Sequence, residues 1–115
     1  MEYLVIPIQK SDTKTYIFEG DTIHQIVISG DEFPVLTTST IKMQLYRNNK
    51  LYFDVSNGNG ITVDSATQFT INKVEAVDNP FNEGEYEGDL EITDVDGVKT
   101  TYFRVRYIIQ KEYTK

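Results

Sequence analysis

Residues 41–55 have the sequence IKMQLYRNNKLYFDV, in which two runs of alternating apolar residues flank a polar turn. The alternating apolar positions are Ile41, Met43 and Leu45 before the turn, and Leu51, Phe53 and Val55 after it. A period of two is typical of strands that bury one face. The stretch therefore predicts a β-hairpin with one face in a hydrophobic core.

The length of the turn follows from side-chain parity. The two apolar faces must lie on the same side of the sheet, so a pairing of Leu45 with Leu51 needs an odd number of loop residues. We therefore predict a three-residue turn, Arg47-Asn48-Asn49. Asn49 is expected near the left-handed region, which asparagine tolerates.

The rest of the chain shows the same alternation between short clusters of turn residues. Strands are expected over residues 3–9, 14–19, 22–29, 41–45, 51–55, 61–63, 69–71, 86–92 and 101–107, with loops over 10–13 and 31–39. One helical turn fits within residues 72–81, because Pro80 would stop a longer helix. Short, regularly spaced strands rich in aromatic and β-branched residues indicate an all-β sandwich or barrel.

The last hairpin has the opposite parity. Its inner faces pair even-numbered residues around Leu90 with odd-numbered residues around Phe103, so its loop is expected to be even in length. Asp94-Val95-Asp96-Gly97, or Asp96-Gly97 alone, satisfies this, and Asp-Gly is a strong hairpin signal. A four-residue turn would place Glu87 opposite Arg104 and Glu85 opposite Arg106.

Composition limits the kinds of ligand. The 115 residues are the usual size of one domain, and the formal net charge of −7 disfavours binding to nucleic acids or anionic membrane surfaces. There is no cysteine, which excludes disulfides and thiolate zinc sites, and only one histidine, His24, which excludes a two-histidine metal site. We predict no cofactor and no bound metal.

Residues 75–96 contain half of the 18 acidic side chains and no lysine or arginine. Two interpretations are open for this segment: a calcium site or a pair of catalytic carboxylates, and a solvated strand face. Glu85, Glu87 and Asp89 recur with a period of two, out of phase with Leu90, which favours an outward strand face. Residues 94–97 resemble the start of a calcium loop, but a hairpin turn explains them better because Gly and Glu are missing at the sixth and twelfth positions.

No pattern in the chain predicts an enzyme. His24 is expected to be a partly buried strand residue, and no nucleophile-elbow motif accompanies it. Asn57-Gly58-Asn59-Gly60 lacks the lysine of a phosphate-binding loop, so it predicts a tight connection into the strand at Ile61.

Three tyrosines, Tyr46, Tyr52 and Tyr102, are expected to point away from the core if the parity above holds. Exposed tyrosines are favoured at protein interfaces, can stack on sugars, and also occur simply as sheet formers. Candidate partner-binding residues are therefore these tyrosines together with the acidic strand face: Tyr46, Tyr52, Tyr102, Glu85, Glu87 and Asp89.

The order of several short motifs resembles a known family. The motifs are GDTI (20–23), IKMQLYR (41–47), GITV (60–63), FTI (69–71), GEYEGDLEIT (84–93), DG (96–97) and TTYFRV (100–105). Together they resemble the immunoglobulin-like domain at the N-terminus of phage baseplate upper proteins and in related tail and head proteins. The resemblance spans about 85 of the 115 residues.

The resemblance implies an immunoglobulin-like antiparallel β-sandwich of about seven to nine strands. We expect a single domain over residues 1–115, whose ends extend beyond the resemblance and are interpreted as extended arms at 1–10 and 108–115. It also implies that Tyr86 acts as a tyrosine corner, with its hydroxyl bonded to nearby backbone. The function expected from it is a non-enzymatic virion structural protein, made in the host cytoplasm, that binds other phage structural proteins or itself. The role that we favour is an auxiliary or decoration protein of the capsid, and the alternatives are a tail or baseplate adaptor and a carbohydrate-binding host-adhesion module.

Overall fold

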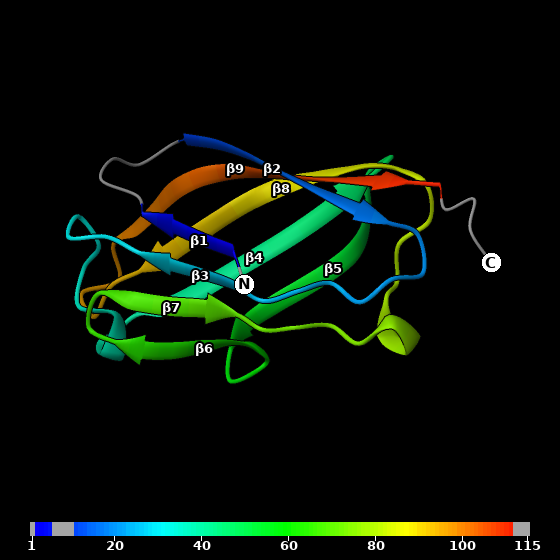
Figure 1. Ribbon diagram of the computed structural model, residues 1–115. Helices are drawn as coiled ribbons and strands as arrows, with labels where there is room; N and C mark the ends of the chain where they lie inside the picture. The colour runs from blue at the N-terminus through cyan, green and yellow to red at the C-terminus, as the bar shows by residue number, and fades with distance from the viewer. Residues whose placement is uncertain (1, 6–10, 112–115) are drawn as a thin grey trace.

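Strands make up most of the molecule, and no α-helix occurs in the part of the chain that the structure describes (Figure 1). The computed structural model describes residues 2–5 and 11–111, with side chains from residue 13 onward. Its strands are β1 (Glu2–Val5), β2 (Ser11–Phe18), β3 (Ile26–Ser29), β4 (Thr40–Arg47), β5 (Lys50–Asn57), β6 (Gly60–Ser65), β7 (Gln68–Ile71), β8 (Gly84–Thr93) and β9 (Lys99–Gln110). The prediction of an all-β fold is confirmed.

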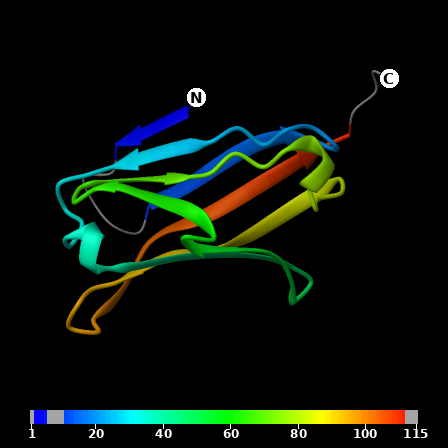
Figure 2. The same cartoon turned by 90° about the horizontal axis from the view of Figure 1, so that it is seen from below.

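The strands form one hydrogen-bonded sheet in the order β1-β3-β7-β6-β5-β4-β8-β9-β2. The sheet curls between β5 and β6, so that β1, β3, β7 and β6 form a layer facing β5, β4, β8, β9 and β2 (Figures 1 and 2). Only two residue pairs, Ser56 with Gly60 and Asn57 with Ile61, join β5 to β6. The chain passes from one layer to the other at this short junction.

The core lies between the two layers. In β4, Ile41, Met43 and Leu45 are fully buried, whereas the residues between them are exposed or half-buried. The predicted inward face of this strand is therefore confirmed. Other fully buried side chains come from both layers and from the connection before β4: Leu36, Ile61, Phe69, Tyr86, Leu90, Ile92, Phe103 and Tyr107.

The turn of the β4–β5 hairpin is shorter than predicted. It contains two residues, Asn48 and Asn49, because Arg47 pairs directly with Lys50. Both asparagines have positive φ angles, 53° and 63°, as a type I′ turn requires. The left-handed conformation predicted for Asn49 is confirmed, and the three-residue turn is wrong.

The extra unpaired residue that side-chain parity requires in this hairpin lies in strand β5 and not in the turn. Pairing passes from Tyr46–Leu51 to Leu45–Phe53, so Tyr52 is an extra residue that forms a β-bulge. Leu45 therefore faces Phe53, and the predicted pairing of Leu45 with Leu51 is wrong.

The β8–β9 hairpin differs from its prediction for the same reason. Its loop has five residues, 94–98, instead of an even number. The pairing then passes from Glu91–Thr101 to Leu90–Phe103, which leaves Tyr102 as a second bulge residue. The five loop residues and the single bulge residue add up to an even number of unpaired residues. Leu90 and Phe103 therefore still point to the same, inward side of the sheet.

Several predicted boundaries are corrected by the structure. β2 begins at Ser11, inside the loop expected over 10–13, and β3 begins only at Ile26. β9 continues to Gln110, so residues 108–110 belong to a strand and not to an arm. Residues 2–5 of the other expected arm form β1, which pairs with β3, while residues 6–10 and 112–115 lie outside the described part.

The connections agree with the sequence. The loop expected over 31–39 contains one 3₁₀ turn, η1 (Leu36–Thr38), and the helical turn expected within 72–81 is η2 (Ala76–Asp78). Residues 57–60 form the predicted tight connection, closed by a hydrogen bond from the Asn59 amide to the Ser56 carbonyl (2.8 Å).

Tyr86 has the contact expected of a tyrosine corner. Its side chain is fully buried near the start of β8. Its hydroxyl donates to the Asn82 carbonyl (3.2 Å) and accepts from the Asn82 amide (3.2 Å). The side chain of Arg47 lies beside the same hydroxyl (3.4 Å) and also donates to the Glu83 carbonyl (2.9 Å). These bonds fix the loop that enters β8 against the end of β4.

Candidate functional site

The outward faces of β4, β8 and β9 bring candidate residues into rows across the sheet. Tyr46 of β4 lies opposite Glu87 of β8, which in turn lies opposite Arg106 of β9. In a neighbouring row, Asp89 lies between Gln44 and Arg104. The outward orientation predicted for the acidic residues of β8 is confirmed. Their cross-strand partners differ by two residues from those predicted, because the bulge at Tyr102 and the longer loop shift the register.

Ion pairs join the acidic strand to β9. Asp89 lies 2.9 Å from Arg104, and Arg106 lies 3.9 Å from Glu85 and 3.6 Å from Glu87. All of these side chains are substantially exposed, so each pair contributes between zero and about 1 kcal/mol. The acidic residues are thus partly neutralised side chains of a solvated face, with one guanidinium shared by two carboxylates.

Tyr46 lies beside an open depression of about 460 Å³ at the end of the β4–β5 hairpin. Its lining residues are Tyr46, Arg47, Asn48, Asn49, Glu85 and Glu87. The tyrosine ring is 39% exposed, and its hydroxyl donates to the side-chain carbonyl of Gln44 (3.3 Å). The structure thus brings together three candidate residues, Tyr46, Glu85 and Glu87, with an arginine that was not singled out.

Tyr102 and Tyr52 do not point outward as predicted. Tyr102 is only 7% exposed and packs edge-on against Phe33, with 5.0 Å between ring centroids. Tyr52 is half-buried and packs edge-on against Tyr86, also at 5.0 Å, with the Lys50 ammonium 5.3 Å from its ring. Both are the extra residues of β-bulges, where the strict alternation of side chains fails. Parity could not place them because the bulges are not visible in the pattern.

Burial of Tyr102, and then the negative charges of Asp94 and Glu32, raise the pKa of its phenol above the ordinary value. A raised pKa means that the fold favours the neutral phenol. The resulting stability is complete below the unfolded pKa near 10 and is lost as pH rises through the folded pKa.

Replacement of Tyr102 by Phe should therefore remove part of the alkaline loss of stability. We expect the free energies of unfolding of the two proteins to agree within about 0.5 kcal/mol at pH 7 and to diverge above pH 10, in favour of the variant. Urea unfolding of both proteins between pH 7 and pH 11 measures this difference. A difference that does not change with pH would contradict the assignment.

The Asp94–Gly97 segment is a hairpin turn, as predicted. The carboxylate of Asp94 accepts hydrogen bonds from the amides of Asp96 and Val98, both at 2.9 Å. The Gly97 amide closes the turn on the Asp94 carbonyl (3.0 Å), and Gly97 has a φ of 85°. The Asp94 carboxylate thus caps its own turn.

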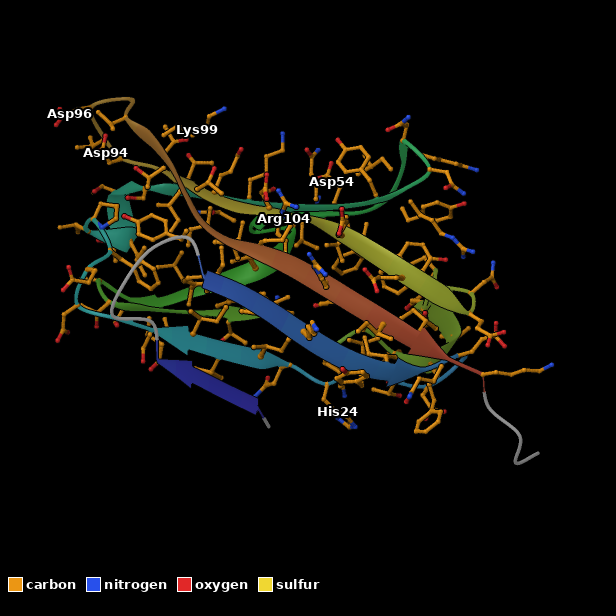
Figure 3. All side chains as sticks on the ribbon, turned by 90° about the horizontal axis from the view of Figure 1, so that it is seen from above. His24, Asp54, Asp94, Asp96, Lys99 and Arg104 are labelled. Carbon is orange, nitrogen blue, oxygen red and sulfur yellow. The ribbon has the colours of Figure 1, made fainter. Side chains whose placement is uncertain are left out.

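The single histidine of the chain lies away from the acidic residues of the β8–β9 loop. Figure 3 shows Asp94, Asp96 and Lys99 together at the β8–β9 loop and His24 on the opposite side of the molecule. His24 is exposed and precedes β3, so the prediction of a partly buried strand residue is wrong. Within the described residues, no group of three or more His, Asp or Glu side chains is arranged to hold a metal ion. That same part of the chain has no helix with the length and hydropathy needed to cross a bilayer.

Two exposed aromatic side chains on β2 were missed by the sequence reasoning. Tyr16 is 62% exposed and Phe18 is 50% exposed. Their spacing of two within a strand was visible, but only the strand order shows that β2 is an edge strand.

Comparison with known proteins adds no assignment to this geometry. No family model matches the chain, and a search of curated proteins finds no match.

Proposed function

We propose that this chain is an immunoglobulin-like structural module of a bacteriophage virion, which binds other virion proteins through its surface without catalysing a reaction. The observation that carries the proposal is the strand order combined with the hydroxyl contact of Tyr86. One layer, β1-β3-β7-β6, follows the order A-B-E-D of an immunoglobulin sandwich, and β5-β4-β8-β9 follows C′-C-F-G. Tyr86 then lies near the start of strand F, which is the position of the tyrosine corner.

Three features depart from that plan. β1 runs parallel to β3 and β2 runs parallel to β9, whereas the sheets of the immunoglobulin sandwich are antiparallel. The two residue pairs between β5 and β6 also join the layers into one sheet. All three departures lie at an edge or at a layer junction, and β4, β8 and β9 keep antiparallel pairing with one another.

The surface around Tyr46 supports a protein partner. Tyrosine and arginine are among the residue types enriched at binding hot spots, and Tyr46 and Arg47 line one depression together with acidic residues of β8. An open depression with both signs of charge is suited to side chains of another protein. The carbohydrate-binding alternative would use the tyrosines predicted to point outward, and the packing of Tyr52 and Tyr102 leaves only Tyr46 of those three exposed.

The role that we propose is that of an auxiliary protein on the capsid. The test is mass spectrometry on purified virions, followed by separation of heads from tails. We expect the chain in the head fraction, at many copies per particle. Its presence only in tails would support the adaptor alternative, and its absence from particles would overturn the proposal.

Substitution of Tyr46 by Ala should weaken co-sedimentation of the protein with capsids by about tenfold or more, because a hot-spot side chain is lost. The matched control is Val95→Ala, an exposed apolar residue (73%) in the β8–β9 loop at the other end of β8. Equal binding by the two variants would place the contact elsewhere on the molecule.

The dependence of capsid attachment on ionic strength tests whether charged side chains contribute to this contact. Raising the ionic strength from about 0.1 M to about 1 M shortens the screening length from about 10 Å to about 3 Å, so attachment should weaken. The double variant Glu85→Gln/Glu87→Gln should lose most of this salt dependence. Asp31→Asn/Asp96→Asn changes the net charge equally at exposed positions of two other loops and should keep the dependence. Salt-independent attachment of the unmodified protein would contradict an electrostatic contribution.

A further inference from the structure

Among the described strands, the edge strand β2 is bonded only to β9, and at its end the Phe18 carbonyl accepts a hydrogen bond from the Asp21 amide of the following turn (3.1 Å). It is the last strand of the sheet and pairs with β9 from Ser11 to Phe18. Figure 1 shows it along the upper rim of the molecule, above β1 and β3. A strand of this length at an open edge is a template for pairing with another chain.

The register shows which backbone groups face the open side. The Glu19 amide donates to the Gln110 carbonyl of β9 (2.8 Å). Alternate residues of a strand bond to the same neighbour, so the odd-numbered residues of β2 point their amides and carbonyls toward β9. The backbone groups of Lys14 and Tyr16 therefore face the open edge.

The outward side chains of β2 would complement a second copy of the strand. They are Lys14, Tyr16 and Phe18, and both aromatic rings are at least half exposed. In an antiparallel pair centred on Tyr16, the two Tyr16 rings become cross-strand neighbours and each Lys14 lies opposite a Phe18. Aromatic pairs and a cation over a ring both stabilise such contacts.

We propose that two copies of this chain associate through β2, antiparallel and about a two-fold axis at Tyr16, so that β2 of each copy extends the sheet of the other. A lysine on an edge strand normally discourages pairing. In this register each Lys14 lies opposite the ring of Phe18 and not opposite a second lysine. The lysine therefore favours this register over the others. The inference does not depend on the proposed function, because it concerns the isolated protein.

Cysteine cross-linking tests both the contact and its register. The chain has no cysteine, so one engineered cysteine is the only thiol. Directly opposed residues that share hydrogen bonds have Cα atoms about 5.5 Å apart, which is within the range of a disulfide. Under mild oxidation, Tyr16→Cys should form a covalent dimer on non-reducing gels.

Two single-cysteine variants serve as controls. Lys14→Cys lies on the same strand, but the two copies of position 14 would be four residues apart, or about 13 Å. Val77→Cys lies on η2 and is 90% exposed. Both should stay largely monomeric, whereas an equal mixture of Lys14→Cys and Phe18→Cys should form the mixed dimer. Equal cross-linking of Tyr16→Cys, Lys14→Cys and Val77→Cys would overturn the proposal.

Sedimentation equilibrium tests the association without a cross-link. Tyr16→Pro removes an amide that faces the open edge and leaves the bonds to β9 in place, so it should weaken dimerisation at least tenfold while the far-ultraviolet circular dichroism is kept. Tyr16→Lys, which puts two ammonium groups opposite each other, should have the same effect without a backbone change. An unmodified protein that sediments as a monomer at every concentration up to roughly 1 mM would overturn the proposal.

Discussion

Replacement of Gly88 by Ala should lower the free energy of unfolding by about 3 kcal/mol, the largest effect of a single methyl group that we expect in this protein. Gly88 lies in the middle of β8, opposite Leu45 of β4 and Val105 of β9. A Cβ atom at this position would overlap the backbone carbonyl oxygen of Gln44. The overlap can be relieved only by moving β4 away from β8, because a backbone atom cannot rotate aside as a side chain does.

Urea unfolding followed by circular dichroism measures this loss, since the chain has no tryptophan. The control is Gly20→Ala, where the added methyl group meets open space but φ is +80°. Backbone strain alone should cost about 1 kcal/mol there. If the two variants lose the same free energy of unfolding, the close approach of β4 to Gly88 adds no extra cost to the substitution.

Replacement of Tyr86 by Phe should lower the free energy of unfolding by about 2 kcal/mol. The ring would still fill the core, but the Asn82 amide and carbonyl would lose their partner in a partly buried position. A polar group left without a hydrogen bond costs about 1–3 kcal/mol. Arg47 would keep its bond to the Glu83 carbonyl and its position 5.5 Å from the ring centroid.

The control for this variant is Tyr46→Phe. Its hydroxyl is exposed and bonds only to the side chain of Gln44 among the contacts described, so its removal should change stability by less than about 0.5 kcal/mol. If Tyr86→Phe is as stable as Tyr46→Phe, the hydroxyl does not hold the loop that enters β8.

Local alternation predicted the buried positions of β4 and β8 well, but it was wrong for Leu51 of β5, which lies opposite the outward Tyr46 and is 41% exposed. It identified Ile41, Met43 and Leu45 as one inward face, because in a regular strand orientation depends only on parity. It also predicted that Glu85 and Glu87 face solvent. These positions needed no knowledge of which strands become neighbours.

The strand register and the exposure of particular surface side chains could not be predicted from alternation alone. Parity fixes only whether the number of unpaired residues in a hairpin is odd or even, and it does not say whether the loop or a strand holds them. Tyr52 and Tyr102 were therefore placed outward but lie in bulges. The exposure of Tyr16 and Phe18 depends on the strand order, which is a property of the whole sheet. The depression at Tyr46 likewise needs β4 beside β8.

The parallel pairing of β2 with β9 has a mechanical consequence. Eight residue pairs, from Ser11–Phe103 to Phe18–Gln110, connect the two strands. The start of β2 and the end of β9 lie at opposite ends of this pairing. Tension that pulls these two points apart would load all the connecting hydrogen bonds at once, in shear, instead of opening them one after another. The pairing should therefore resist stretching far better than a hairpin pulled at its open end.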